Sequence, residues 1–248
     1  MPRKPRRDVG GLVYHVLNRR VGRGRLFFAD GDYAAFEKVL AQAAERFPAV
    51  ALLSYCLMPN HWHLVLWTRR DGILSRYMQW LTTTHMRRWH ARRHSAGTGP
   101  VYQGRFKSFP AQADDHALVV CRYVERNPLR AKLVRRARDW RWSSAADRPA
   151  ADRPWLLPRD RWPVEPPRDW PAWVERPHTD AELAALRRGV IRGSPFGDDR
   201  WAAATARRLG LEPSLRPIGR PRKRNPAEEG NPERRTSKSR GRRSLNEA

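Results

Sequence analysis

The sequence predicts an α+β protein whose first part is a ferredoxin-like domain with an antiparallel sheet. Short runs of apolar, β-branched and aromatic residues alternate with longer segments of helical periodicity, in the order β-α-β-β-α-β. The second and third runs are separated only by the tight turn Met58-Pro-Asn60, which indicates a hairpin. The length of 248 residues allows one sizeable core with appendages.

Each element of this domain rests on a local pattern. A β-rich run opens the domain, and Gly31 then begins a segment in which Tyr33, Phe36 and Leu40 recur at helical spacing and which ends before Pro48. A second long periodic segment is followed by turn residues at 95–100. The expected strands are 11–17, 50–57, 61–67 and 101–110, and the expected helices are 31–47 and 73–94.

A further helix is expected from about Asp114 to Arg126, with a turn beginning at Pro128. From Trp140 onward tryptophans and prolines are frequent, so this segment is expected to be irregular and to wrap the core. Its aromatic rings could stack unpaired bases, although packing onto the core is the favoured interpretation.

Two more helices are expected after the tryptophan-rich segment. Thr179 and Glu182 form a capping-box pattern that begins one helix, and Ser194-Pro195 opens another that stops at Gly210. The residues after 215 are rich in Arg, Pro and Ser, which is typical of a chain that is disordered when free. These patterns divide the chain into 1–145, 146–178, 179–215 and 216–248.

The charge of the chain predicts a polyanionic partner. Fifty Lys and Arg stand against twenty-five Asp and Glu, which gives a formal charge of +25. Arginine prevails over lysine, and its planar fork suits phosphates and stacks on bases, so nucleic acid is favoured over a membrane surface. A high-GC genome explains part of the preference for arginine, but it does not explain the scarcity of acids.

Localisation follows from what the sequence lacks. Cys56 and Cys121 both lie in apolar runs, which indicates buried thiols in a reducing compartment. The basic start is not followed by an apolar stretch of signal-peptide length, and no window reaches the roughly 18 apolar residues of a membrane span. We therefore expect a cytoplasmic, nucleoid-associated protein.

The pair His61 and His63 is the most informative feature of the chain. Alternate residues of a strand point to one face, so both imidazoles project together while Trp62 faces the other side. Neutral imidazoles are good ligands for divalent ions, so the pair is half of a metal site. A His-x-His pair is common, however, and a satisfied structural pair is an equally good interpretation of these two residues alone.

Tyr123 and Asn127 lie four residues apart and would share one face of the helix. A tyrosine that attacks a phosphodiester needs help, which a divalent ion held by His61 and His63 could supply. Asn127 would add an oxygen ligand of the kind that Mg²⁺ or Mn²⁺ prefers. Both residues also have structural alternatives. Tyr123 could be an ordinary core residue, and Asn127 could be the N-cap of a helix whose first residue is Pro128.

These motifs together resemble the single-tyrosine HUH transposases and, within them, the REP-associated tyrosine transposases. The resemblance runs from about Val13 to Ser144. It implies a ferredoxin-like HUH domain in which His61 and His63 hold Mg²⁺ or Mn²⁺, Tyr123 is the nucleophile and Asn127 is the third ligand. The matching motifs are Tyr14-His15-Val16 with Asn18-Arg19, Met58-Pro-Asn-His-Trp-His63, Tyr102-Gln-Gly-Arg-Phe106 and Tyr123-Val-Glu-Arg-Asn-Pro-Leu-Arg-Ala131.

The family cuts single-stranded DNA at hairpin-bearing repeats, leaves a 5′-phosphotyrosine and a free 3′-OH, and rejoins strands without external energy. Trp62 is bulkier than the residue usual between the two histidines, but it faces away from the expected metal.

Several arginines are candidate DNA contacts. Three of them recur every four residues beside the face of the helix that carries Tyr123. Others lie in the motifs that carry the family resemblance and at the end of the second helix. The last lie in the tail, where Gly219 to Arg224 resembles an AT-hook core. For the arginines of the tail, non-specific tethering to DNA is the favoured role. For the arginines at the end of the second helix, a favourable interaction with the helix dipole explains part of the cluster without DNA. The candidates are Arg19, Arg87, Arg88, Arg105, Arg122, Arg126, Arg130, Arg220 and Arg222.

The sequence therefore predicts a metal-dependent enzyme that nicks and joins single-stranded or hairpin DNA, and a monomer rather than a homodimer. The alternative is a domesticated relative that binds hairpin DNA or RNA without cutting. An RNA-recognition domain shares the topology, but its aromatic signature is missing. A structural zinc protein is disfavoured because no third or fourth soft ligand stands at the spacing of zinc sites.

Overall fold

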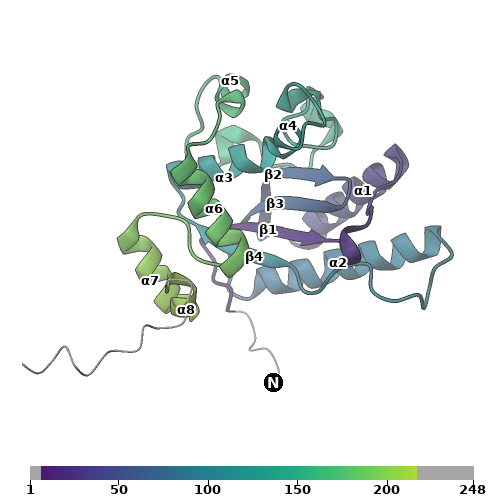
Figure 1. Cartoon of the computed structure of the whole chain (residues 1–248), viewed down its shortest axis with the longest axis horizontal. Coiled ribbons are helices and arrows are strands. Elements are labelled where there is room, and N and C mark those ends of the chain that lie inside the picture. The colour runs from purple at the N-terminus through teal and green to yellow at the C-terminus, as the bar shows by residue number, and fades with distance from the viewer. Residues whose placement is uncertain (1–6, 217–248) are drawn as a thin grey trace, which may run out of the picture. The chain divides into compact units, whose positions relative to one another are not determined.

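The computed structural model describes residues 7–216, and the compact unit of the chain ends at Leu215. Its centre is an antiparallel sheet of the order β2-β3-β1-β4 (Figure 1). Three helices connect or follow these strands in the predicted order, so the ferredoxin-like fold is confirmed. The strands are β1 (Val13–Arg19), β2 (Val50–Met58), β3 (His61–Thr68) and β4 (Lys107–Ala111), and the helices are α1 (Asp30–Arg46), α2 (Ile73–Arg92) and α3 (Asp115–Glu125).

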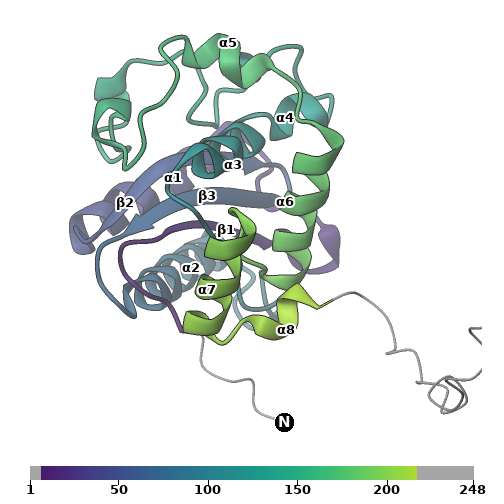
Figure 2. The ribbon, with the colours of Figure 1, turned by 90° about the vertical axis from the view of Figure 1, so that its left-hand side faces the viewer.

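The two faces of the sheet are covered by different helices. In Figure 2, α3 lies in front of the sheet, whereas α1 and α2 lie behind it. The alternation of β3 follows this division, because Trp62 and Leu64 enter the core on the α1–α2 side while Val65 packs on the α3 side. Trp62 is fully buried and donates from Nε1 to the Tyr102 hydroxyl at 3.1 Å. It faces away from the histidine side, as its position in the strand predicts.

The last strand is shorter than predicted. The apolar run that begins at Val101 does not extend the sheet, because Val101 and Tyr102 are buried on the α1–α2 side as part of a loop. Tyr102 makes only an isolated bridge to Arg20, and Asn18 donates to the carbonyl of Gly104. Regular pairing with β1 begins at Lys107. The loop therefore packs against the end of β1 instead of continuing the strand.

Five further helices follow α3 in the described chain, and four 3₁₀ turns lie before and after it. One helix, α6, begins after Thr179 through the predicted capping box. The elements are α4 (Asn127–Arg130), α5 (Trp170–Glu175), α6 (Asp180–Arg192), α7 (Asp199–Leu209) and α8 (Glu212–Leu215), with 3₁₀ turns at Val21–Arg23, Ala137–Asp139, Ala150–Asp152 and Arg159–Arg161.

The prediction that a helix opens at Ser194-Pro195 is wrong. The helix α7 begins only after Asp198, whose side chain accepts from the backbone N–H of Trp201 and caps the first turn. The Ser194 hydroxyl instead donates to the carbonyl of Ser214. Phe196 pairs with the edge of β4, so the residues before α7 are extended. The predicted stop at Gly210 is correct, since Gly210 has φ +69°.

Both outer strands of the sheet are covered by later parts of the chain. Along β2, Leu57 donates to the carbonyl of Trp142, Ser144 donates to Tyr55, and Leu157 donates to Leu52. Along β4, Phe196 donates to the carbonyl of Pro110 and accepts from the N–H of Gln112. Three of the six tryptophans between 140 and 173 are buried, namely Trp142, Trp162 and Trp170, and the other three are partly buried against the cores, which agrees with their predicted role.

No helix in the described range 7–216 is long and apolar enough to cross a membrane. The tail interpretation, including the AT-hook resemblance at Arg220 and Arg222, lies outside the described residues.

Candidate active site

The two histidines lie where the β2–β3 hairpin returns. His61 is the first residue of β3 and pairs with Arg19 of β1 and Met58 of β2, and His63 pairs with Leu17 and Cys56. Both imidazoles project to the α3 side, and their ring centroids are 4.9 Å apart. The alternation of the strand therefore places the two rings side by side, as predicted from their spacing.

The protein keeps both rings uncharged at neutral pH. Burial lowers the pKa of His61 to about 4, with the cationic Arg19 and Arg130 acting in the same direction. Burial also holds the pKa of His63 well below its usual value, and the neighbouring His61 adds to this effect. Neutral imidazole is the form that binds a metal, so both rings are in the required state at pH 7.

Each ring has its Nδ1 atom engaged by a neighbouring side chain. His61 Nδ1 lies 2.5 Å from Oδ1 of Asn60, and His63 Nδ1 lies 2.8 Å from Nε2 of His15. A metal-binding histidine usually uses one ring nitrogen for the metal and donates the other N–H to a neighbouring group. This arrangement leaves both Nε2 atoms available and distinguishes the pair from two histidines that merely fill the core.

Tyr123 comes from α3 and packs against His63 of the pair and against His15. Its ring lies edge-on to His63 at 6.1 Å and to His15 at 6.0 Å between centroids. Only 8% of the residue is exposed, and the guanidinium of Arg130 lies 4.2 Å above its ring. The fold thus brings together a tyrosine and two histidines that are about sixty residues apart in sequence.

Asn127 is the first residue of α4, four positions after Tyr123; it is buried and its amide is already engaged. Its Nδ2 donates to the carbonyls of Tyr123 at 3.0 Å and Val124 at 3.3 Å, and its Oδ1 accepts from Arg130 at 2.6 Å. The side chain therefore closes the last turn of α3 and does not cap α4. An amide oxygen has two lone pairs, so Oδ1 can accept from Arg130 and still serve as a ligand.

The residues present fit a divalent cation of the hard kind. Among the described residues, no three or more His, Cys, Asp and Glu side chains gather as a metal site. A third ligand for His61 and His63 would therefore have to be an amide oxygen or water, which suits Mg²⁺ or Mn²⁺ better than structural zinc. Asn127 is an amide whose side chain bonds to the backbone of Tyr123.

Two of the three arginines on the Tyr123 helix are engaged within the protein. Arg122 is 6% exposed, forms an ion pair with Glu182 at 2.6 Å and stacks on Trp173. Arg126 donates to the carbonyls of Val174 and Glu175 at the end of α5. DNA contact by these two guanidinium groups, a prediction based on their spacing, would require the intramolecular contacts to open.

The other candidate arginines are more accessible. Arg130 is exposed, and so are Arg87, Arg88 and Arg105, although Arg88 donates to Gln42 at 2.8 Å. Arg19 is half-buried beside His61, where its charge helps to lower the pKa of that histidine. These five positions are compatible with DNA contact.

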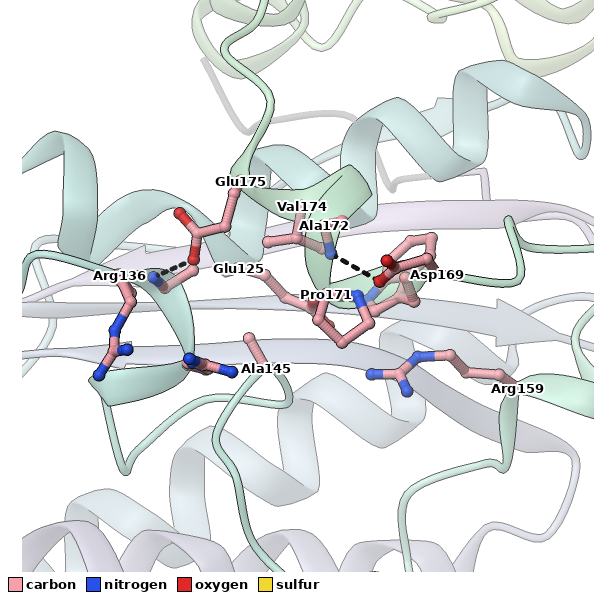
Figure 3. Close-up of a pocket in the computed structure, with 12 residues that line it drawn as sticks. Glu125, Arg136, Ala145, Arg159, Asp169, Pro171, Ala172, Val174 and Glu175 are labelled. Atoms are coloured by element: carbon pink, nitrogen blue, oxygen red, sulfur yellow. Dashed lines mark hydrogen bonds between the residues drawn. The ribbon is translucent and has the colours of Figure 1, made fainter.

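A separate cavity of about 330 Å³ lies among α3, α5 and the 137–145 segment. Figure 3 shows Arg136 and Arg159 on opposite sides of it, with Pro171 and Asp169 of the α5 region between them. Glu125 forms part of the wall; it is fully buried and accepts from Trp170 Nε1 at 2.8 Å and from the Ser144 hydroxyl at 2.6 Å. None of the predicted site residues lines this cavity, so it is distinct from the Tyr123 site.

Three residues at the site were not predicted as functional. His15 and Asn60 hold the two histidines, and the ring of His178 lies edge-on to Tyr123 at 6.0 Å. His15 sits on the same face of β1 as Leu17, the partner of His63, so the strand alternation could have indicated it. His178 arrives from the distant α5–α6 connection, and no local pattern could have placed it there.

Comparison with known proteins gives a family for the domain that holds this site. Residues 8–127 match the family described as "Transposase IS200 like". A solved REP-associated tyrosine transposase bound to a REP hairpin is similar, with 18% identity, 58% of this chain and 81% of that chain covered, and a TM-score of 0.46. A transposase candidate from Deinococcus radiodurans has 17% identity, 53% and 92% coverage and a TM-score of 0.35. No curated protein matches the chain.

Proposed function

Because the domain at residues 8–127 belongs to the IS200-like transposase family, we propose that this chain nicks and joins single-stranded DNA with Tyr123 as its nucleophile. One observation supports this proposal above the others: a helix tyrosine packs against His63, which with the adjacent His61 forms a pair of neutral histidines whose Nε2 atoms are both available. A binding module would need the basic surface but not this constellation.

In the proposed reaction the Tyr123 hydroxyl oxygen attacks a backbone phosphorus, and the bond from phosphorus to the 3′ oxygen breaks. The phenolic proton is lost to solvent, and the departing oxygen takes up a proton to become a 3′-OH. The product is a 5′-phosphotyrosine. Attack by a 3′-OH on this ester restores the phosphodiester and frees Tyr123, so joining needs no external energy.

The residues of the site supply orientation and charge. A divalent ion such as Mg²⁺ or Mn²⁺, held by His61, His63 and Asn127, would polarise the scissile phosphate and stabilise charge on the departing oxygen. The Arg130 guanidinium lies above the Tyr123 ring and is exposed, so it can stabilise the phenolate and also meet the phosphate. The packing of Tyr123 against His63 and Arg130 would hold its ring in place for the attack.

We propose single strands that carry a hairpin as the substrate. The charge of +25 favours a phosphate backbone, and the motifs that resemble REP-associated transposases favour a hairpin end. The alternative function is binding of such hairpins without cleavage. Cleavage of a labelled hairpin oligonucleotide separates the two, since only the enzyme shortens it and becomes covalently labelled.

The decisive test is Tyr123→Phe, which removes only the phenolic oxygen. We expect loss of cleavage and of the covalent adduct, while single-strand affinity stays within a few-fold, because binding rests on many Arg–phosphate contacts. Tyr77→Phe is the matched control, since Tyr77 is buried in the other core. An adduct that persists in the Tyr123 variant would move the nucleophile elsewhere.

Metal dependence is tested in the same assay. Cleavage should require Mg²⁺ or Mn²⁺, stop with EDTA and fail in the His61→Ala, His63→Ala double variant. Asn127→Ala should weaken metal dependence by less than the histidine changes. A rate that EDTA leaves unchanged would contradict the metal assignment, and a wild-type chain that binds hairpins but never forms an adduct would favour the binding function.

A further inference from the structure

The neighbour of His63 is a third histidine, His15, which the reaction described above does not use. It is fully buried, its Nε2 lies 2.8 Å from Nδ1 of His63, and the two rings are stacked with an interplanar angle of 12°. Because Nε2 is directed at His63, His15 is not itself placed as a metal ligand.

Two neutral imidazoles joined in this way share a single hydrogen-bond proton. If the proton is on His15, the Nδ1 of His63 is an acceptor and its Nε2 carries the other proton, which prevents metal binding. If His63 donates from Nδ1, its Nε2 presents a lone pair to the metal. The choice of tautomer therefore decides whether His63 can act as a ligand.

We infer that His15 is a positioning residue: it accepts the Nδ1–H of His63 and thereby holds His63 in the tautomer and orientation that bind the cation. This inference rests on the proposed function, because it concerns the same metal pair. Asn60 holds His61 in the same manner, since its amide oxygen at 2.5 Å accepts the Nδ1–H of that ring. The two histidines then have one hydrogen-bond acceptor each.

The surroundings of His15 argue against a purely structural role. Its Nδ1 is buried and has no hydrogen-bond partner, a condition that packing alone would avoid with an apolar side chain. Its ring also contacts Phe109 at 4.9 Å and Tyr123 at 6.0 Å between centroids. A phenylalanine would satisfy these contacts better than an imidazole does. The imidazole is explained by its bond to His63.

The test is the affinity of the full chain for Mn²⁺, measured without DNA by electron paramagnetic resonance of the free ion. His15→Phe keeps a ring but removes the acceptor, and we expect a loss of about 10- to 100-fold in affinity. His15→Gln restores an acceptor and should recover most of the loss. The matched control is His85→Phe, which removes a buried imidazole on the opposite side of the sheet and should leave the affinity unchanged.

A second measurement does not depend on any variant folding. In ¹⁵N-labelled wild-type protein loaded with Mg²⁺, nitrogen chemical shifts should show His63 protonated at Nδ1. An unprotonated Nδ1 on His63, or a folded His15→Phe variant with wild-type Mn²⁺ affinity, would overturn the inference. Failure of the proposed metal site looks different, because then the His61→Ala, His63→Ala double variant would bind Mn²⁺ as well as wild type.

Discussion

Arg130 differs from Arg122 and Arg126 in the groups that its side chain contacts. Its guanidinium lies 4.2 Å above the Tyr123 ring and donates to Asn127 Oδ1 at 2.6 Å, so a single exposed cation joins the proposed nucleophile to the proposed third ligand. Arg122 and Arg126 face other partners. Of the three arginines spaced by four residues, Arg130 is therefore the one that we assign to the chemistry.

We predict that Arg130→Gln slows cleavage by about tenfold, because an exposed cation over an aromatic ring contributes roughly 0.5–1 kcal/mol and the bond to Asn127 adds to this. Single-turnover cleavage of a hairpin oligonucleotide at saturating protein measures the effect. The exposed Arg87→Gln is the control and should leave this rate unchanged. An Arg130 variant that cleaves at the wild-type rate would remove Arg130 from the mechanism.

At the scale of the element, α3 is held from two sides. Its inner face packs on the sheet, and its outer arginines bind the α5 and α6 region, which lies beyond the family match. The last turn of α3 carries Tyr123, so these contacts help to fix the position of the proposed nucleophile. The C-terminal extension thus takes part in building the site.

The ion pair between Arg122 and Glu182 provides a test of this arrangement. Arg122 is buried and Glu182 is partly buried, so we predict that Arg122→Met lowers the free energy of unfolding by about 1–3 kcal/mol. A double-mutant cycle with Glu182→Gln should give a coupling energy of at least about 0.5 kcal/mol. Urea denaturation measures both. Unchanged stability combined with weaker DNA binding would instead support Arg122 as a DNA contact.

The sequence predicted those features of the fold and the site that depend only on residues close together in the chain. Strand alternation correctly places Trp62 opposite the two histidines, and helical periodicity gives α1, α2 and α3 nearly at their observed bounds. The partners of Arg122 could not be derived in this way, since Glu182 lies sixty positions away and four-residue spacing shows only that side chains share a face. The same limit applies to His178, which reaches Tyr123 from a distant connection.

Across the whole molecule, three histidines on the two sides of the sheet are buried in the neutral form: His15, His63 and His85. Burial lowers the pKa of His15 and of His85 to about 3, and that of His63 also lies well below its usual value. Below the ordinary histidine pKa of about 6.5 the unfolded chain binds protons that the folded protein excludes. Stability is therefore fully present above this pH and falls as the pH decreases toward the folded values.

We predict that the free energy of unfolding falls by about 1.4 kcal/mol per pH unit for each such histidine between roughly pH 6 and pH 4. Urea denaturation at pH 7.5, 6, 5 and 4.5 measures the slope. His85→Phe should reduce the slope by about 1.4 kcal/mol per pH unit, which is the contribution of one histidine, and should leave the Tyr123 side of the sheet unaltered. A slope that is the same in this variant as in wild type would show that His85 is not buried in the neutral form.

The covered sheet edges have a consequence for how the protein is made. The four strands are complete once Ala111 has been synthesised, but β2 is covered only by residues 142–157 and β4 only by Phe196. At a translation rate of about 5–20 residues per second, the outer edge of β4 waits several seconds for its cover. During that interval the nascent chain presents unpaired backbone groups that another strand can bind. The order of the segments along the gene therefore sets a period of vulnerability that ends only when Phe196 has emerged from the ribosome.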